Sequence, residues 1–248
     1  MQYDNLTVQQ KQNLLTITIQ TASPKENYLD KATTAELAHV LEHMPDVHAV
    51  MFRGTRKAFS LGAAINQFSA GDSIRKFVER GQQLFQKIHT LPCITIAAVE
   101  GYALGGGFEL ALACDMIVAS DRARFGLVES NIGVMPGWGG FFRLAKRIGA
   151  HRSLEWVLSG AIMQAEQALS LGIIQQMFPR KEFDSSLDAF LASFIHKPKV
   201  TIHAIKKAFL ALGEGTGAEE YSKLEARLFA RLWQNQDVQD MLKKFRGQ

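Results

Sequence analysis

The first part of the chain alternates short apolar runs with segments that carry apolar residues at helical spacing. Residues 14–20, "LLTITIQ", are rich in β-branched side chains and partly alternate, which predicts a strand. Residues 31–44, "KATTAELAHVLEHM", have the periodicity of a helix that stops before Pro45. The run "VHAVMFRG" predicts a second short strand that ends at Gly54, and residues 73–89 predict an amphipathic helix.

The most apolar segment of the chain covers residues 94–119. Its pattern predicts a buried strand, a glycine turn, a helix that ends near Cys114, and a further strand in "DMIVASDRARFG". The segment is long enough to cross a bilayer, but Glu100, Glu109 and Asp115 interrupt it, so we do not interpret it as a membrane span. The recurring order of strand, strand and helix predicts an α/β core with mostly parallel strands buried on both faces.

The chain is mostly helical from "GGFFRLAKRIG" onward. We therefore predict a boundary near residue 190, with a core over residues 1–190 and a helical C-terminal section over residues 191–248. A helical tail after a compact core often serves as an assembly surface, although the same apolar faces are equally explained by packing within the chain.

The composition narrows the class of protein. The chain has 248 residues, of which 47% are hydrophobic and 21% charged, as is ordinary for a globular protein. Only two cysteines occur, Cys93 and Cys114, both in apolar surroundings, so we expect reduced core thiols rather than a disulfide framework. The N-terminal residues lack the basic and then apolar order of a secretory signal, which favours a cytoplasmic location.

The formal net charge of +4 suits a small ligand that carries phosphates as well as it suits nucleic acid. Basic runs interleaved with aromatic residues are not visible, so we expect neither nucleic acid nor a membrane as a partner. His39, Glu42 and His43 match an inverted zinc-binding signature, H-x-x-E-H. Because they lie near the end of a short helix and no further ligand-like segment stands out, we expect no metal site.

Three successive glycines, Gly105, Gly106 and Gly107, stand between a predicted strand and a predicted helix in "GYALGGGFELALACD". Glycines at such a turn let the backbone approach a ligand closely, and the start of the helix offers free N–H groups to a developing oxyanion. The fingerprints of a dinucleotide site and of a P-loop are both incomplete here. A tight turn that binds no ligand explains the same glycines.

Glu109 follows Gly106 by three residues and lies in an apolar run, which suggests a buried carboxylate about one helical turn further along. Glu129 lies in "FGLVESNIGVMPGWGG", in a loop flanked by glycines. Two carboxylates that converge on one water can act as base and acid. The alternatives are a glutamate that complements the helix dipole and an exposed loop glutamate, respectively.

Taken together, these motifs resemble the crotonase family, also called the enoyl-CoA hydratase/isomerase superfamily. The resemblance runs from "RKAFSLGAAI" through the triple glycine and "PGWGG" to "VLSGAIMQAEQALSLGII" and "LEARLF". It implies an α/β, crotonase-like superhelix of ββα units with a helical C-terminal section that builds homotrimers or dimers of trimers. It also implies an acyl-CoA thioester as substrate, with no separate cofactor.

The resemblance implies specific site residues. The two N–H groups of an oxyanion hole fall on Ala63 and Gly106, and the two glutamates of a hydratase match Glu109 and Glu129. We expect Glu129 to exchange protons with Cα of the substrate and Glu109 to act as the base for water. The remaining substrate-binding candidates are Lys57, Ala58, Gly62, Ala64, Ile65, Gly105, Pro136, Gly137 and Trp138.

Some residues depart from the family pattern. Ala64 stands where an aspartate is usual, and Asn66 stands where a basic residue is common, which leaves Lys57 as the candidate for the CoA phosphates. Trp138 replaces a small residue and resembles the branch of ethylmalonyl-CoA decarboxylases. The sequence therefore favours an enoyl-CoA hydratase, with a decarboxylase of malonyl-type CoA thioesters and a catalytically silent acyl-CoA-binding homologue as alternatives.

Overall fold

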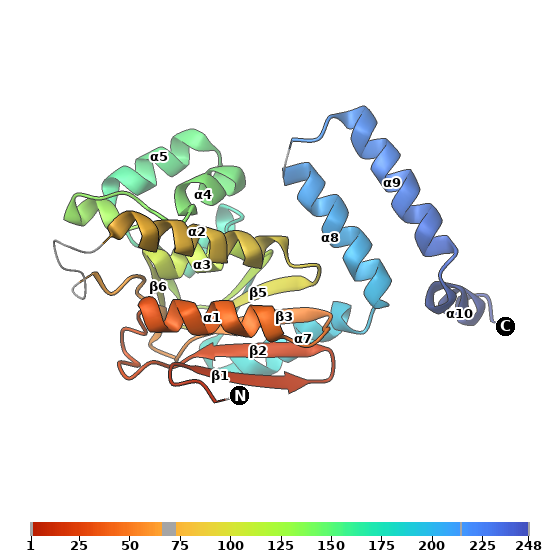
Figure 1. Ribbon diagram of the computed structural model, residues 1–248, viewed down its shortest axis with the longest axis horizontal. Helices are drawn as coiled ribbons and strands as arrows, with labels where there is room; N and C mark the ends of the chain where they lie inside the picture. The colour runs from red at the N-terminus through yellow and green to blue at the C-terminus, as the bar shows by residue number, and fades with distance from the viewer. Residues whose placement is uncertain (1, 66–72, 214, 248) are drawn as a thin grey trace.

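Two sheets form the core of the protein, for which a computed structural model describes residues 2–65, 73–213 and 215–247 (Figure 1). The first sheet has the strand order β1-β2-β3-β5-β7-β10, and the second has the order β4-β6-β8-β9. The strands of the first sheet are β1 Leu6–Lys11, β2 Leu14–Ile19, β3 Ala49–Arg53, β5 Ile94–Val99, β7 Met116–Ser120 and β10 Gln176–Phe178. Those of the second are β4 Ala58–Ser60, β6 Tyr102–Leu104, β8 Arg124–Gly126 and β9 Met163–Gln164.

The expected ββα repeat is confirmed. Each of three strands of the first sheet is followed along the chain by a short strand of the second sheet before the next α-helix begins: β3 by β4, β5 by β6, and β7 by β8. β4, β6 and β8 pair in parallel, as do β2, β3, β5 and β7. The helices of the core are α1 Lys31–His43, α2 Ile74–Thr90, α3 Gly106–Ala113, α4 Gly140–Ile148, α5 Ala150–Ser159 and α6 Ala165–Ser170, with 3-10 turns η2 Glu129–Ile132 and η3 Arg180–Glu182.

The first strand of the structure was missed by the sequence analysis. β1 pairs antiparallel with β2, from Leu6 opposite Ile19 to Lys11 opposite Leu14. The end of β1, "QQK", is polar and exposed because β1 is an edge strand with one wet face, so it lacks the apolar signal of a buried strand. Gln12 completes the hairpin turn with a φ of 52°.

The central strands of the first sheet, β3, β5 and β7, are buried on both faces, as predicted. Along β3, Val50 and Phe52 join a large apolar cluster with α1, α2 and α3, whereas Ala49 and Met51 join a smaller cluster under α7. α7 spans Phe183–Ile195. The central strands therefore read as continuous apolar runs rather than alternating ones.

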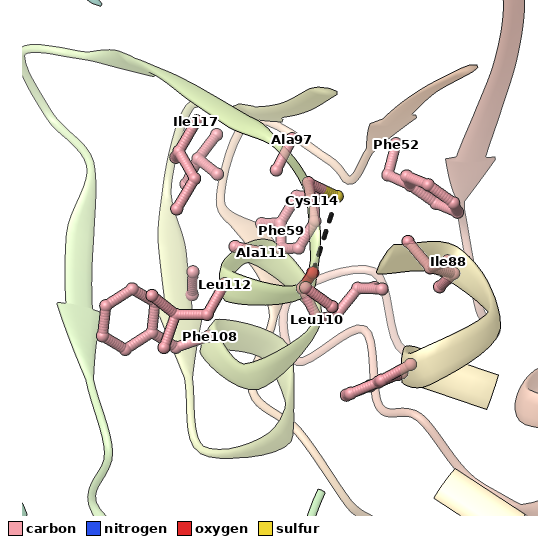
Figure 2. Packing of buried hydrophobic residues seen from close by; sticks show 14 of the residues in the cluster. Phe52, Phe59, Ile88, Ala97, Phe108, Leu110, Ala111, Leu112, Cys114 and Ile117 are labelled. Atoms are coloured by element: carbon pink, nitrogen blue, oxygen red, sulfur yellow. Dashed lines mark hydrogen bonds between the residues drawn. The ribbon is translucent and has the colours of Figure 1, made fainter. Parts of the chain in front are cut away.

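Helix α3 lies in the middle of the larger cluster, and all eight of its residues are buried. Figure 2 shows its side chains against Phe59 and Ala97 of the two sheets and Ile88 of α2. The expectation of core thiols is confirmed, since Cys93 and Cys114 are both free and buried. Burial raises the pKa of the Cys93 thiol to about 11, and that of Cys114 is raised further by the same cause.

The C-terminal helices extend away from the core (Figure 1). α8 Lys199–Gly213 and α9 Ala218–Trp233 pack side by side, and α10 Gln236–Phe245 follows at the C-terminal end of α9. The predicted boundary near residue 190 lies within α7, which packs on the sheet through Leu187 and Leu191. A division of the chain into residues 1–190 and 191–248 stays a prediction.

α8 is fixed to the core by a buried ion pair. Lys206 of α8 is 1% exposed, and its Nζ donates to Oδ1 of Asp115. Oδ2 of the same carboxylate accepts from the N–H and the hydroxyl of Thr95, at 2.8 and 3.0 Å. Beyond α8 the packing is different, because none of the described residues of α9 and α10 is buried. Within the described residues, no helix has both the length and the apolar character needed to cross a membrane.

Candidate active site

Two backbone segments meet at the start of α3. Gly62 has a φ of +92°, and a Cβ placed on it would lie 2.5 Å from the backbone nitrogen of Gly106. Gly106 is the first residue of α3, so its N–H points out of the helix without an intrahelical acceptor. Only glycine fits at residue 62, because any side chain there would lie against the N–H of Gly106. Ala63 is the next residue along the chain, so its backbone follows directly on this contact.

The other two glycines of the turn are also favoured, Gly107 by a close contact and Gly105 by its positive φ. A Cβ on Gly107 would lie 2.1 Å from the carbonyl oxygen of Ser60, so α3 begins directly against β4. Gly105 has a φ of +50°, and a Cβ there would lie 3.4 Å from Oε1 of Glu129. The triple glycine is therefore more than a tight turn, because it joins β4, α3 and the glutamate of another loop.

Glu109 is held by the loop that contains "PGWGG". Its side chain is 2% exposed, and Oε1 accepts hydrogen bonds from the N–H groups of Trp138 at 2.7 Å and Gly140 at 2.8 Å. A Cβ on Gly140 would lie 2.5 Å from Cγ of Glu109, so this loop approaches the glutamate as closely as a backbone can. Burial raises the pKa of Glu109, while the N–H groups of Gly140 and Trp138 and the charge of Arg143 act against that rise.

Arg143 is a candidate that the sequence analysis missed. Its Nη1 donates to the carbonyl oxygen of Trp138 at 2.7 Å, and a Cβ on Gly139 would lie 2.6 Å from the same nitrogen. Burial lowers the pKa of Arg143, and the charge of Glu109 raises it. Arg143 thus braces the loop and places a positive charge near Glu109. Its position in the sequence, five residues after Trp138 on α4, could have indicated that it lies near the site. A basic residue on an amphipathic helix is usually a surface residue, however, so this position was not informative enough.

Glu129 has the opposite environment. It is the first residue of η2, and both of its carboxyl oxygens are buried without a hydrogen-bond partner among the described residues. Burial, and then the charge of Glu109, raise the pKa of Glu129 to about 7. The alternative of an exposed loop glutamate is therefore wrong. Burial raises the pKa of both carboxyls, but only Glu109 has N–H donors of other residues and a nearby cation that act against the rise.

The remaining candidates lie at different distances from this centre. Gly62, Ala63 and Ala64 come directly after β4, whose neighbour β6 leads into Gly105. Ile65 is 55% exposed, whereas Ala64 and Pro136 are buried and Gly137 is half-buried. Ala58 is buried at the start of β4, and its carbonyl oxygen accepts the N–H of Thr55.

Lys57 is exposed at the opposite end of β4 from Gly62. Its predicted contact with CoA phosphates stays a prediction. Asn66, which departs from the family pattern, lies outside the described residues.

The residues of the rejected zinc signature have other contacts. Nδ1 of His39 lies 2.9 Å from the hydroxyl oxygen of Tyr3, and Glu42 pairs with Lys87 at 3.4 Å. Over residues 2–65, 73–213 and 215–247, three or more histidine, cysteine, aspartate or glutamate side chains do not gather in any place that could hold a metal ion.

Comparison with known proteins defines the class. The sequence profile of the enoyl-CoA hydratase/isomerase family matches residues 9–247, and the chain belongs to this family. It is 32% identical over 230 residues to the "Probable enoyl-CoA hydratase" of Bacillus subtilis (strain 168), covering 90% of this chain and 89% of that one.

Solved structures agree with this assignment. The enoyl-CoA hydratase of Thermoplasma volcanium GSS1 superposes with a TM-score of 0.89 at 27% identity, over 97% of this chain and 96% of that one. A Thermobifida fusca YX protein in complex with acetoacetyl-CoA superposes with a TM-score of 0.86 at 26% identity, over 93% and 96% of the two chains. The fold expected from the sequence, a crotonase-like α/β fold, is confirmed.

Proposed function

We propose that this protein is an enoyl-CoA hydratase, which adds water across the double bond of a 2-enoyl-CoA thioester. The observation that carries the proposal is the unequal pair of glutamates. Glu109 accepts hydrogen bonds from two backbone N–H groups and lies near the charge of Arg143. The carboxyl oxygens of Glu129 are buried without a hydrogen-bond partner among the described residues, and its pKa is raised to about 7. One group suited to accept a proton therefore lies close to one suited to donate a proton.

In the proposed reaction Glu109 removes a proton from water while the water oxygen forms a bond to Cβ of the substrate. The electron pair of the double bond moves toward the thioester, and Glu129 delivers its proton to Cα. The product then carries one additional water, and a proton returns from Glu109 to Glu129 by way of the next water. This assignment of roles follows the partners of the two carboxyls.

The N–H groups of Ala63 and Gly106 are the proposed donors to the thioester oxygen, which becomes negative as the enolate forms. The contact between Gly62 and Gly106 supports this role, because it places the two backbone segments side by side. One such donor typically contributes about 3 kcal/mol to transition-state stabilisation. The thioester supplies its own activation, so the proposed reaction needs no cofactor.

The proposed substrate is an acyl-CoA thioester, as supported by the acetoacetyl-CoA complex of the Thermobifida fusca protein. Gly105, Pro136 and Gly137 are the proposed lining of the substrate site beside the two glutamates, and Lys57 is the proposed contact for the phosphates of CoA.

Decarboxylation of a malonyl-type CoA thioester is the second candidate, and Trp138 in "PGWGG" favours it. Loss of CO2 also leaves an enolate that the N–H groups of Ala63 and Gly106 could stabilise. The two reactions differ in their need for Glu129, because decarboxylation does not require a proton pair around a water.

A panel of acyl-CoA thioesters tests the proposal. The purified protein is incubated with 2-enoyl-CoAs of increasing chain length, and the absorbance of the conjugated thioester is followed; methylmalonyl-CoA and ethylmalonyl-CoA are assayed for release of CO2. Hydration of at least one 2-enoyl-CoA is the expected result. Release of CO2 without hydration would establish the second candidate, and no turnover by the folded protein would indicate a silent acyl-CoA-binding homologue.

A further inference from the structure

The indole ring of Trp138 occupies a space that two glycines make for it. A Cβ on Gly81 of α2 would lie 2.1 Å from Nε1 of the indole, and a Cβ on Gly106 of α3 would lie 2.3 Å from Cζ3. Phe77 and Phe85 meet the ring edge to face, each with ring centroids 5.2 Å apart from it. Trp138 is 3% exposed, so the indole fills this space almost completely.

Gly81 shows that the space is specific for a large ring. It lies inside the 17-residue helix α2, where glycine is less favourable than alanine. A single methyl group at residue 81 would collide with the indole, so the contact with Trp138 explains why α2 has a glycine at this position.

Trp138 borders the proposed reaction centre in two ways, through its backbone N–H at Glu109 and through its ring at Gly106. The N–H of Trp138 donates to Oε1 of Glu109 at 2.7 Å. The point where a Cβ of Gly106 would lie is 2.3 Å from the indole and 3.4 Å from Cα of Gly62, so the indole edge closes the junction of the two oxyanion segments. In the proposed complex, an acyl chain whose Cα and Cβ lie between Gly106 and the glutamates extends past this residue.

We propose that Trp138 sets the length of the acyl group, and that the enzyme acts on short-chain thioesters of about four carbons. The inference rests on the proposed function, because it takes Gly106 as a donor to the thioester oxygen. An apolar cavity of about 150 Å³ accepts a molecule the size of benzene, and removing the indole vacates a space of that order. The vacated space is lined by Phe77, Phe85 and the two glycines, which suits additional methylene groups.

The test compares chain-length profiles of the wild-type protein, Trp138→Ala and Trp138→Leu. For the wild type we expect kcat/KM to fall at least 10-fold from four-carbon to eight-carbon 2-enoyl-CoA. In the variants the ratio of eight-carbon to four-carbon kcat/KM should rise at least 10-fold. The largest rise in this ratio that we expect is about fourfold for each additional methylene of the acyl chain, which corresponds to about 0.8 kcal/mol for each buried CH2.

The matched control is Phe125→Leu. Phe125 is a fully buried aromatic residue that packs against Phe108 with ring centroids 5.3 Å apart, and it is not among the nearest neighbours of Gly81 or Gly106. Its replacement removes core volume and should lower the melting temperature without altering the chain-length ratio. Circular dichroism confirms that each variant is folded, and Trp138→Leu provides the result if Trp138→Ala does not fold.

Binding of saturated acyl-CoAs, measured by calorimetry over the same chain lengths, separates this inference from the proposed function. If the protein hydrates no 2-enoyl-CoA but binds four-carbon acyl-CoA more tightly than eight-carbon acyl-CoA, with the preference lost in the variants, the proposed function is wrong and the role of Trp138 holds. Three results would overturn the inference. The wild-type protein turns over or binds both chain lengths equally, the variants keep the wild-type ratio of eight-carbon to four-carbon substrate, or the protein binds no acyl-CoA.

Discussion

At the scale of single residues, the partners of two glutamates determine their chemistry more than their position does. Glu109 is the more deeply buried, yet it has two N–H donors and the charge of Arg143 nearby. Glu129 has neither, and it faces the charge of Glu109. The resemblance to the crotonase family implied that the two groups converge on one water, but the sequence could not show which one has donors. That depends on the backbone path of the loop around Trp138.

Hydration should depend on pH through Glu129. Because Glu129 gives a proton to Cα, kcat/KM for hydration should fall as pH rises through about 7, the raised pKa of this group. Dehydration of the corresponding 3-hydroxyacyl-CoA should show the same limb, because the reaction takes up and releases no net proton and both directions use the glutamate pair with one proton on it. Steady-state kinetics in both directions between pH 5 and 9 check this, and a kcat/KM for hydration that does not fall above pH 7 would contradict the role of Glu129.

The same pKa affects stability. A carboxyl whose pKa is raised in the folded state, from 4.5 to about 7, stabilises the protein fully at low pH, and that contribution is lost as pH rises between the two values. Glu129→Gln cannot ionise, so its free energy of unfolding above pH 7 should exceed that of wild type by at most about 3 kcal/mol. At pH 4 the two proteins should have the same free energy of unfolding. Equilibrium unfolding at the two pH values measures this; an equal difference at both would rule out ionisation as its cause.

Arg143 should act on Glu109 through charge and through the loop. In Arg143→Met we expect the pKa of Glu109 to rise, which moves the acidic limb of kcat/KM to higher pH because Glu109 must be ionised to accept a proton. Loss of the bond to the Trp138 carbonyl should also lower kcat/KM by about 10- to 100-fold. Arg143→Lys, which keeps the charge, should restore the position of the limb, and an unchanged limb in Arg143→Met would contradict this role.

At the scale of elements, the sequence predicted the buried strands and most helices, because their apolar periodicity is produced by burial on both faces. It missed β1, whose outer positions are polar, and it did not separate β4, β6 and β8, which have only three residues each. Strands of that length carry no period of their own. The separate contacts of the glycines at residues 105–107 were also beyond the sequence, since each depends on a different distant segment.

The junction of β4 and α3 should be intolerant of any side chain at residue 107. A methyl group there would lie 2.1 Å from the Ser60 carbonyl oxygen, so Gly107→Ala has to shift α3 or β4. We expect a loss of about 1–3 kcal/mol in the free energy of unfolding, as is usual for overpacking, together with reduced activity. Gly213→Ala is the matched control, because a Cβ there has open space, and it should change stability by less than about 0.5 kcal/mol. Equal stabilities of the two variants, measured by denaturant unfolding, would contradict the close contact.

At the scale of the whole molecule, several large apolar side chains of the C-terminal helices are exposed. Phe229 and Trp233 stack on α9 with ring centroids 5.8 Å apart, and both are exposed, as is Phe245 of α10. The buried pair of Lys206 and Asp115 fixes α8 to the core, and α9 packs against α8. These features support the proposed homo-oligomer, a trimer or a dimer of trimers, built through residues of the C-terminal section.

This proposal predicts a change in mass on substitution. Light scattering of the wild-type protein should give the mass of a trimer or hexamer, and the double variant Phe229→Glu, Trp233→Glu should give a smaller species, because charges oppose burial of the stacked pair. An equivalent double substitution at exposed positions of α1, Ala35→Glu and Ala32→Glu, controls for added charge. A wild-type monomer, or a double variant with unchanged mass, would contradict assembly through α9.

The most direct test of the account is hydration of crotonyl-CoA by three proteins, followed by mass spectrometry for the addition of one water. Wild type should form the hydrated product, Glu129→Gln should be slower by about 10²- to 10⁴-fold in kcat/KM, and Glu155→Gln, at an exposed glutamate of α5, should match wild type. A folded wild-type protein that forms no hydrated product, or a Glu129→Gln variant as active as wild type, would contradict the central claim that Glu109 and Glu129 form an acid–base pair around water.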